Sequence, residues 1–264
     1  MKISKKLPLL YISALLVMFS CTSQKELTYL NNLDTASVSQ FYPMERPEYR
    51  IQYQDILYVN VFTINEQLNT QLNPVSRLSS SMMFRDASST YIYGYTVSDS
   101  GDITLPILGD IKVYGKTISE IKFAIEERAK QYLKDANVNV KLLSFKFTVI
   151  GEVANPGTYI NYNNQLTVLD AIGMGGDITE YGDRKRVLVL RATENGTQTF
   201  RINLQDKMLL QSQGYFLLPN DIVIVEPIKS KPFQVNLPVT TLLITTSLST
   251  ISTLILLINF INAN

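Results

Sequence analysis

The chain of 264 residues contains no histidine, no tryptophan and one cysteine. Histidine is the commonest general base and the commonest metal ligand, so its absence argues against an enzyme and a metal site. Charge of one sign is not in excess, because 24 Lys and Arg are balanced by 23 Asp and Glu. No basic surplus therefore points to nucleic acid as a partner. We therefore expect a non-enzymatic protein that needs no cofactor.

The N-terminus (1–20) has the form of a secretory signal peptide, with lysines before an apolar run from Leu7 to Phe19. This run is too short to span a bilayer comfortably. Cys21 follows at the expected cleavage point, and Met18–Cys21 resembles a bacterial lipobox. We predict that Cys21 is the lipidated first residue of the mature chain. The alternative is an ordinary cleaved signal, or an uncleaved anchor, beside a chance thiol.

The C-terminal segment 235–261 is predicted to be a membrane-spanning helix, because no charged side chain follows Lys231. A helix from Leu237 to Phe260 would measure about 36 Å, against a hydrocarbon core of about 30 Å. Hydroxyl residues recur along one side of it, at Thr241, Thr245, Ser249, Ser252 and Thr253. This stripe predicts either close helix–helix packing or a water-facing pore. The alternative is a plain anchor whose hydroxyls bond to their own backbone.

The body of the chain is predicted to contain two α+β units after a polar tether at 21–48. In the first unit, residues 65–90 are expected to form a long loop, and a capping box at Thr117 predicts the start of a helix. In the second unit, Thr167 predicts the start of a short helix. The turn residues 194–196 predict a β-hairpin.

A short internal sequence similarity links the two units. Tyr49–Val59 and Tyr215–Val225 share Tyr, Asp, Ile and Val at equal spacing. This similarity suggests that both units contain a similar element in which a turn leads into a strand. A single extended segment, 138–153, is expected to mark the passage between the units.

Several segments resemble a known family. In the first unit these are Tyr49–Val59, Val97–Pro106 with Gly109, and the helix from Thr117, which resemble the polysaccharide export domain of outer-membrane capsule exporters. In the second unit they are Val149–Val153, Asn155–Tyr159, Leu166–Ile172 and Gly175–Gly176, which resemble an SLBB domain of β-grasp fold. The chain departs from the family where Gln52–Gln54 replace the usual glycines, and it has room for one SLBB unit.

The resemblance implies an export domain at 49–144 and an SLBB domain at 145–229. Relatives of this kind form ring homo-oligomers whose C-terminal helices make an outer-membrane pore for capsular or exopolysaccharide. The implied location is the outer membrane, with a lipid anchor and periplasmic soluble domains. The implied partners are further copies of the chain, the polysaccharide, membrane lipid and an inner-membrane chain-length regulator or tyrosine kinase. The alternative is an anchored periplasmic or surface sugar-binding lipoprotein without a pore.

If the chain were instead an envelope glycosidase, its carboxylate pair could be Asp99 with Asp102 or Asp170 with Asp177. Both pairs lie where turns or helix caps are expected, and Asp has an ordinary structural role at such positions. We therefore predict no catalytic, cofactor-binding or metal-binding residue.

Overall fold

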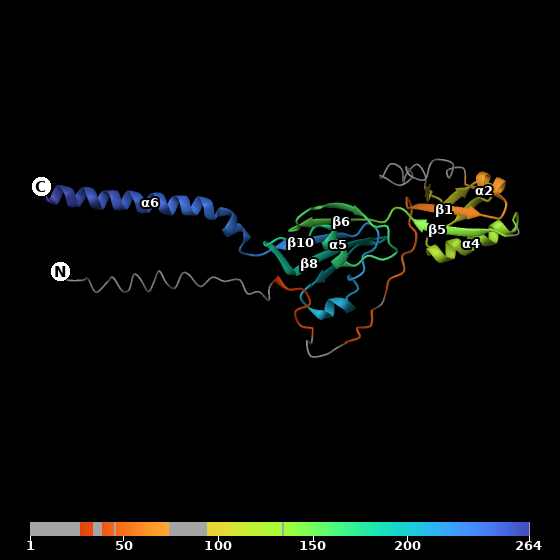
Figure 1. The fold of residues 1–264 in the computed structure, drawn as a ribbon, viewed down its shortest axis with the longest axis horizontal. Helices are drawn as coiled ribbons and strands as arrows, with labels where there is room; N and C mark the ends of the chain where they lie inside the picture. The colour runs from red at the N-terminus through yellow and green to blue at the C-terminus, as the bar shows by residue number, and fades with distance from the viewer. Residues whose placement is uncertain (1–26, 34–38, 45, 74–93, 134, 264) are drawn as a thin grey trace.

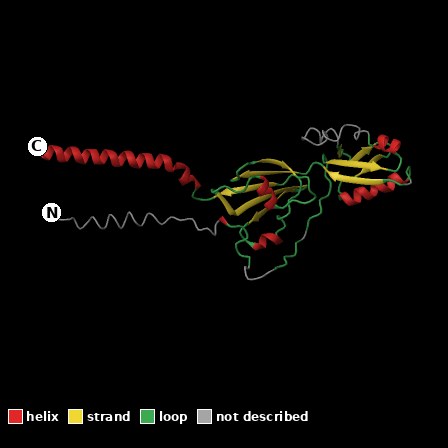
Figure 2. Cartoon of the chain, in the orientation of Figure 1, coloured by secondary structure: helices red, strands yellow, loops and turns green. Residues whose placement is uncertain are grey.

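The computed structural model describes residues 27–33, 39–44, 46–73, 94–133 and 135–263. Within these ranges the chain forms two domains of mixed helices and sheets, followed by one long C-terminal helix (Figures 1 and 2). The mixture confirms the predicted α+β class. Cys21 and the predicted signal peptide lie outside the described residues.

The first domain contains a three-stranded antiparallel sheet in the order β2-β1-β5 and a separate β3–β4 hairpin. Its elements are β1 (Ile56–Phe62), α2 (Glu66–Leu72), β2 (Tyr95–Thr96), β3 (Asp102–Leu105), β4 (Gly109–Lys112), α4 (Ile118–Lys130) and β5 (Asn137–Leu142).

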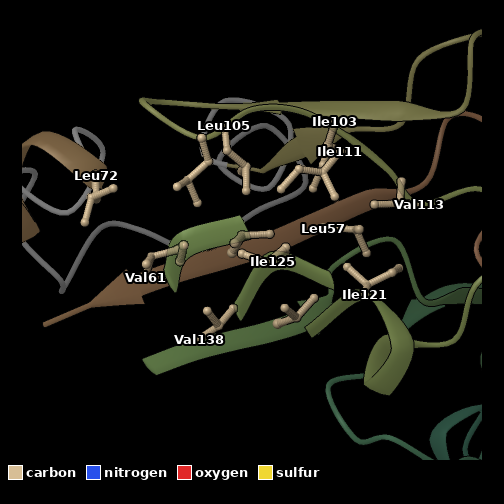
Figure 3. Close-up of a cluster of buried hydrophobic side chains, with 14 of the residues drawn as sticks. Leu57, Val61, Leu72, Ile103, Leu105, Ile111, Val113, Ile121, Ile125 and Val138 are labelled. Carbon is tan, nitrogen blue, oxygen red and sulfur yellow. The ribbon is translucent and has the colours of Figure 1, made fainter. Parts of the chain in front are cut away.

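Alternation along β1 and β5 builds the core of this domain. Leu57, Val59 and Val61 of β1 are buried, as are Val138 and Val140 of β5, while the residues between them point outward. Figure 3 shows side chains of this cluster from β1, the hairpin, α4 and β5 pointing toward one another. This period of two assigns one face of the sheet to the core and the other to solvent.

The predicted capping box is confirmed at the start of α4. The Thr117 hydroxyl accepts the Glu120 N–H, and the Glu120 carboxylate accepts the Thr117 N–H. Burial of Ile121, Ile125 and Ala129 then fixes the inward face of the helix. The prediction of a continuous loop at 65–90 is wrong at its start, because Asn65 caps the short helix α2.

Two asparagines, Asn69 within α2 and Asn73 directly after it, close the free edge of β1. The Asn73 side chain accepts the Val61 N–H at 3.0 Å and donates to the Val61 carbonyl at 2.5 Å. Asn69 makes the same pair of bonds to Thr63, at 2.6 and 2.9 Å. Each amide therefore satisfies the backbone groups that a neighbouring strand would otherwise bond.

The second domain is a five-stranded sheet in the order β7-β6-β10-β8-β9, in which β10 runs parallel to β6 and antiparallel to β8. Its elements are β6 (Lys146–Gly151), β7 (Gly157–Ile160), α5 (Val168–Met174), β8 (Gly182–Thr193), β9 (Gly196–Ile202), the 3-10 helix η3 (Lys207–Gln211) and β10 (Ile222–Pro227). The helix predicted after Thr167 is confirmed as α5, and the predicted hairpin is confirmed as β8–β9.

The stretch predicted as one extended segment, 138–153, is divided between the two domains. It forms β5 in one sheet and β6 in the other. At the end of β6, Gly151 has φ +93°, and a Cβ built there would lie 2.1 Å from the Val225 carbonyl oxygen. Only glycine allows β6 and β10 to approach so closely at this point.

The similarity between segments 49–59 and 215–225 is confirmed in the structure, because both segments form the same kind of turn before a strand. Asp55 and Asp221 each lie directly before a strand, β1 or β10, and both are at most 3% exposed. Each follows a residue with positive φ, Gln54 at +66° and Asn220 at +67°. The shared spacing therefore reflects a left-handed turn that ends in a buried carboxylate.

Candidate functional site

The C-terminal helix α6 runs from Lys231 to Ala263, or 33 residues. Among the described residues, its stretch Thr240–Ile258 is long and apolar enough to cross a membrane. None of this stretch is buried in the single chain, and Figure 1 shows α6 extending away from the second domain. A helix of this length measures about 50 Å at 1.5 Å per residue, longer than a hydrocarbon core of about 30 Å.

The five predicted site residues of α6 are all exposed in the single chain. The Thr245 hydroxyl donates to the Thr241 carbonyl at 2.9 Å, and the Thr253 hydroxyl donates to the Ser249 carbonyl at 2.8 Å. The Ser252 hydroxyl bonds to the Leu248 carbonyl. A hydroxyl that donates to the backbone retains its acceptor lone pairs. These side chains therefore remain able to accept bonds from water or from sugar hydroxyls.

The junction between the domains is held by the buried Asp55. Its carboxylate accepts the Gln52 N–H at 2.9 Å, the Tyr49 hydroxyl at 2.8 Å and the Ser144 hydroxyl at 2.9 Å. Burial raises the pKa of the Asp55 carboxyl above its ordinary value, although these hydrogen bonds act in the opposite direction. Ser144 lies between β5 and β6, so Asp55 attaches the connection between the domains to the start of β1.

Asp221, the equivalent carboxylate of the second domain, has a cationic partner. The Arg191 guanidinium of β8 donates to Asp221 at 2.7 Å and to the Phe216 carbonyl at 2.8 Å. Asp221 also accepts the Leu218 N–H at 2.8 Å. Two similar turns thus use different chemistry, hydroxyl donors in the first domain and an ion pair in the second.

A second contact joins the two domains. The hydroxyl of Tyr114, after β4, donates to the carboxylate of Glu194 at the tip of the β8–β9 hairpin. This bond raises the pKa of Tyr114 to about 12. The Tyr114 ring also stacks on Tyr53, with centroids 4.1 Å apart. The hairpin and the Ser144 junction therefore attach the second domain to the first at two points.

Residues 27–33, within the stretch predicted as a tether, bind to the second domain. The Leu30 N–H donates to the Leu204 carbonyl at 3.0 Å, and the Asn31 N–H donates to the Gln205 carbonyl at 2.8 Å. The Arg184 guanidinium lies 5.3 Å from the centre of the Tyr29 ring. Sequence reasoning missed this contact, although apolar residues at 29 and 30 in a polar segment were a signal for it.

The loop between α5 and β8 contacts both the segment 27–33 and the first residue of α6. Asp177 accepts the Tyr29 hydroxyl. The Tyr181 ring lies 5.9 Å from the ammonium group of Lys231, the first residue of α6, and Lys231 also pairs with Glu152. The segment nearest to Cys21 and the start of α6 are therefore fixed to the same loop.

The carboxylates considered for catalysis have structural partners. Asp102 lies 3.8 Å from the Lys112 ammonium group, and Asp99 accepts a bond from Gln54 at 3.2 Å. Asp170 completes the capping box of α5. Over the ranges that the structure describes, no cluster of three or more acidic, Cys or His side chains is arranged to hold a metal ion.

Comparisons with known proteins agree with the two-domain division. Residues 43–143 match the family model of the polysaccharide biosynthesis/export protein, and residues 145–225 match that of the SLBB domain.

Two similar curated proteins are both named EPS I polysaccharide export outer membrane protein EpsA. The one from Ralstonia nicotianae is 32% identical over 183 residues, or 67% of this chain and 47% of that protein. The one from Ralstonia solanacearum is 30% identical over 184 residues, covering 68% and 48%. The exopolysaccharide production protein ExoF of Rhizobium meliloti is 29% identical over 121 residues, covering 44% and 28%.

The chain thus spans about half the length of the EpsA proteins that it matches. The family predicted from the motifs is confirmed, because both domain models match in the expected order. This chain belongs to the polysaccharide biosynthesis/export family, with one export domain followed by one SLBB domain.

Proposed function

We propose that this chain is a subunit of a ring homo-oligomer that exports capsular or exopolysaccharide across the outer membrane. In this proposal the α6 helices of several copies surround the pore, and the two soluble domains lie in the periplasm. The names of the two Ralstonia relatives, which describe polysaccharide export and an outer-membrane location, support it.

The observation that carries the proposal is the isolation of α6. A hydrophilic polymer needs a wet passage, and helices or closed barrels are the structures that cross a bilayer. A single helix cannot enclose water, so a pore made of α6 requires several copies of the chain. The candidate span is unburied in the single chain and has both hydroxyl-bearing and apolar surface, as a helix between lipid and a lumen requires.

The hydroxyl face would suit transport better than a charged face. Thr241, Thr245 and Ser249 offer uncharged hydroxyl oxygens that accept hydrogen bonds from water and from sugar hydroxyls. Conduction requires binding that is weak enough for release. A hydroxyl lining therefore keeps the polymer hydrated and mobile.

The proposed attachment has a lipid at Cys21 and the spanning helix near the other end of the chain. Partners of the ring would be the polysaccharide and, as the family resemblance implies, an inner-membrane chain-length regulator or tyrosine kinase. The mass of the mature N-terminal peptide tests the lipid. It should equal that of an acylated fragment beginning at Cys21, and the Cys21→Ser variant should lose the acyl mass.

The oligomer is tested on full-length protein extracted in detergent. Mass photometry should give a particle of several subunits, and electron microscopy should show a ring. A strain lacking the chain should lose surface polysaccharide and regain it when the gene is restored. A monomeric particle would exclude the pore, and unchanged surface polysaccharide would exclude the export role.

An anchored sugar-binding lipoprotein without a pore is the second candidate. The hydroxyls of Thr245, Ser252 and Thr253 bond to their own helix, as those of a plain lipid-facing anchor would. Planar-bilayer recordings separate the candidates, since a plain anchor gives no conductance.

A further inference from the structure

The outer face of the export-domain sheet has an unusual composition. Facing away from the core, β1 presents Tyr58, Asn60 and Phe62, and β5 presents Asn137, Asn139 and Lys141. All three β5 residues are exposed, and Phe62 is 46% exposed. Asparagine is depleted in strands, yet these two strands contain three on one face. Strand formation does not explain this choice.

The strand register brings these side chains together in opposing pairs. Tyr58 lies opposite Lys141, Asn60 opposite Asn139, and Phe62 opposite Asn137. Side chains directly opposite on one face have Cβ atoms about 4.5–5.5 Å apart. The Asn60 amide also donates to the Tyr58 hydroxyl at 3.1 Å, which confirms that these two share a face. The result is a row of amides between two aromatic rings.

The chemistry of this row fits a polysaccharide. Each asparagine offers an N–H donor and a carbonyl acceptor without charge, as sugar hydroxyls require. Aromatic rings such as Tyr58 and Phe62 offer an apolar surface with, in tyrosine, a polar end. The face has one cation, Lys141, and no carboxylate among these six residues. Its single positive charge therefore attracts an acidic glycan and does not repel a neutral one.

The same composition is poorly suited to a second copy of the chain. The cores of protein–protein interfaces are apolar and depleted in lysine, whereas four of these six side chains are amides or lysine. The amides would lose hydration in such an interface and would each need a new partner.

We propose that this outer face, formed by Tyr58, Asn60, Phe62, Asn137, Asn139 and Lys141, is a contact surface for the exported glycan. The proposal rests on the export function and adds to it a polymer-binding surface outside the membrane helix. Asn60 and Asn139 bond to sugar hydroxyls, Phe62 packs against a sugar ring, and Lys141 favours acidic sugars.

The absence of tryptophan from the chain allows a direct test. The Phe62→Trp variant carries one fluorophore on the face, and the full-length protein in detergent is titrated with dextran oligosaccharides and with oligogalacturonate. We expect a saturable change in emission. Replacing both Asn60 and Asn139 by alanine should raise the half-saturating concentration about tenfold, since tenfold corresponds to about 1.4 kcal/mol, the scale of one or two net hydrogen bonds.

Two controls establish where the glycan binds. Phe123→Trp, 63% exposed on the outer side of α4, should show no saturable change. Asn195→Ala, at the hairpin tip of the SLBB domain, should leave the Phe62→Trp titration unchanged. Lys141→Gln should weaken the response to oligogalacturonate and spare that to dextran.

The outcomes distinguish this proposal from the export function. A chain that is required for surface polysaccharide, but whose Phe62→Trp probe responds to neither glycan, would overturn the contact surface and leave export intact. Emission that changes with protein concentration alone would assign the face to a second copy and also overturn the proposal. A chain dispensable for surface polysaccharide would overturn export itself.

Discussion

Replacing Arg191 by methionine should remove the guanidinium that lies against the buried Asp221 carboxylate. Asp221 is fully buried, and the Arg191 side chain is 11% exposed. Methionine fills much of the volume but leaves the carboxylate without its cation. Breaking one side of a buried ion pair costs about 3–5 kcal/mol, because the remaining charge is uncompensated. We expect a loss of this size in the stability of the SLBB domain.

The assay is native-state hydrogen exchange of the β8 and β10 amides in full-length protein, because a two-domain chain need not unfold in one step. Arg186→Met is the matched control. Arg186 also lies on β8 and pairs with Asp183 and Glu226, but its side chain is 36% exposed. Its loss should cost about 1 kcal/mol or less. If Arg191→Met costs no more than Arg186→Met, burial is not the source of the effect.

Three further predictions test other parts of the structure. Gly151→Ala should destabilise the SLBB domain by more than about 3 kcal/mol in denaturant unfolding, because the added Cβ meets the Val225 carbonyl of β10. Gly109→Ala is the control, since Gly109 also has positive φ but lies in open space, and it should lower the unfolding free energy by about 1–2 kcal/mol. Asp55→Asn should flatten the pH dependence of the unfolding free energy. Burial raises the pKa of the Asp55 carboxyl in the folded chain, so its contribution is greatest below the ordinary Asp pKa and is lost as the pH rises through the raised value; an unchanged pH profile would contradict this. In bilayer recordings, Thr245→Lys should alter conductance, whereas Ile251→Lys on the opposite side of α6 should prevent insertion; equal effects would contradict a pore-facing hydroxyl stripe.

Local signals in the sequence predicted much of the fold. The capping residues Thr117 and Thr167 gave the starts of α4 and α5, because side-chain to backbone bonds of this kind involve residues three positions apart. The repeated Asp spacing predicted a shared turn, and the structure shows nearly the same positive φ at the residues before Asp55 and Asp221.

Long-range contacts were less accessible to sequence reasoning. The division of residues 138–153 between two sheets depends on which strands each half pairs with, and local β propensity does not encode this. Likewise, the Leu30 contact with Leu204 joins residues far apart in the chain. The hydroxyl face of α6 was visible in the sequence, but a single chain does not determine what that face contacts.

The amides of Asn69 and Asn73 affect how copies of the chain can associate through their strand edges. An exposed strand edge is a template on which other polypeptides add strands, and this growth leads to aggregates and fibres. Here the Asn69 and Asn73 amides bond to the backbone N–H and carbonyl groups of Thr63 and Val61. Copies of the chain that meet at high concentration therefore find this part of the β1 edge already hydrogen-bonded, so it offers no template at Val61 and Thr63.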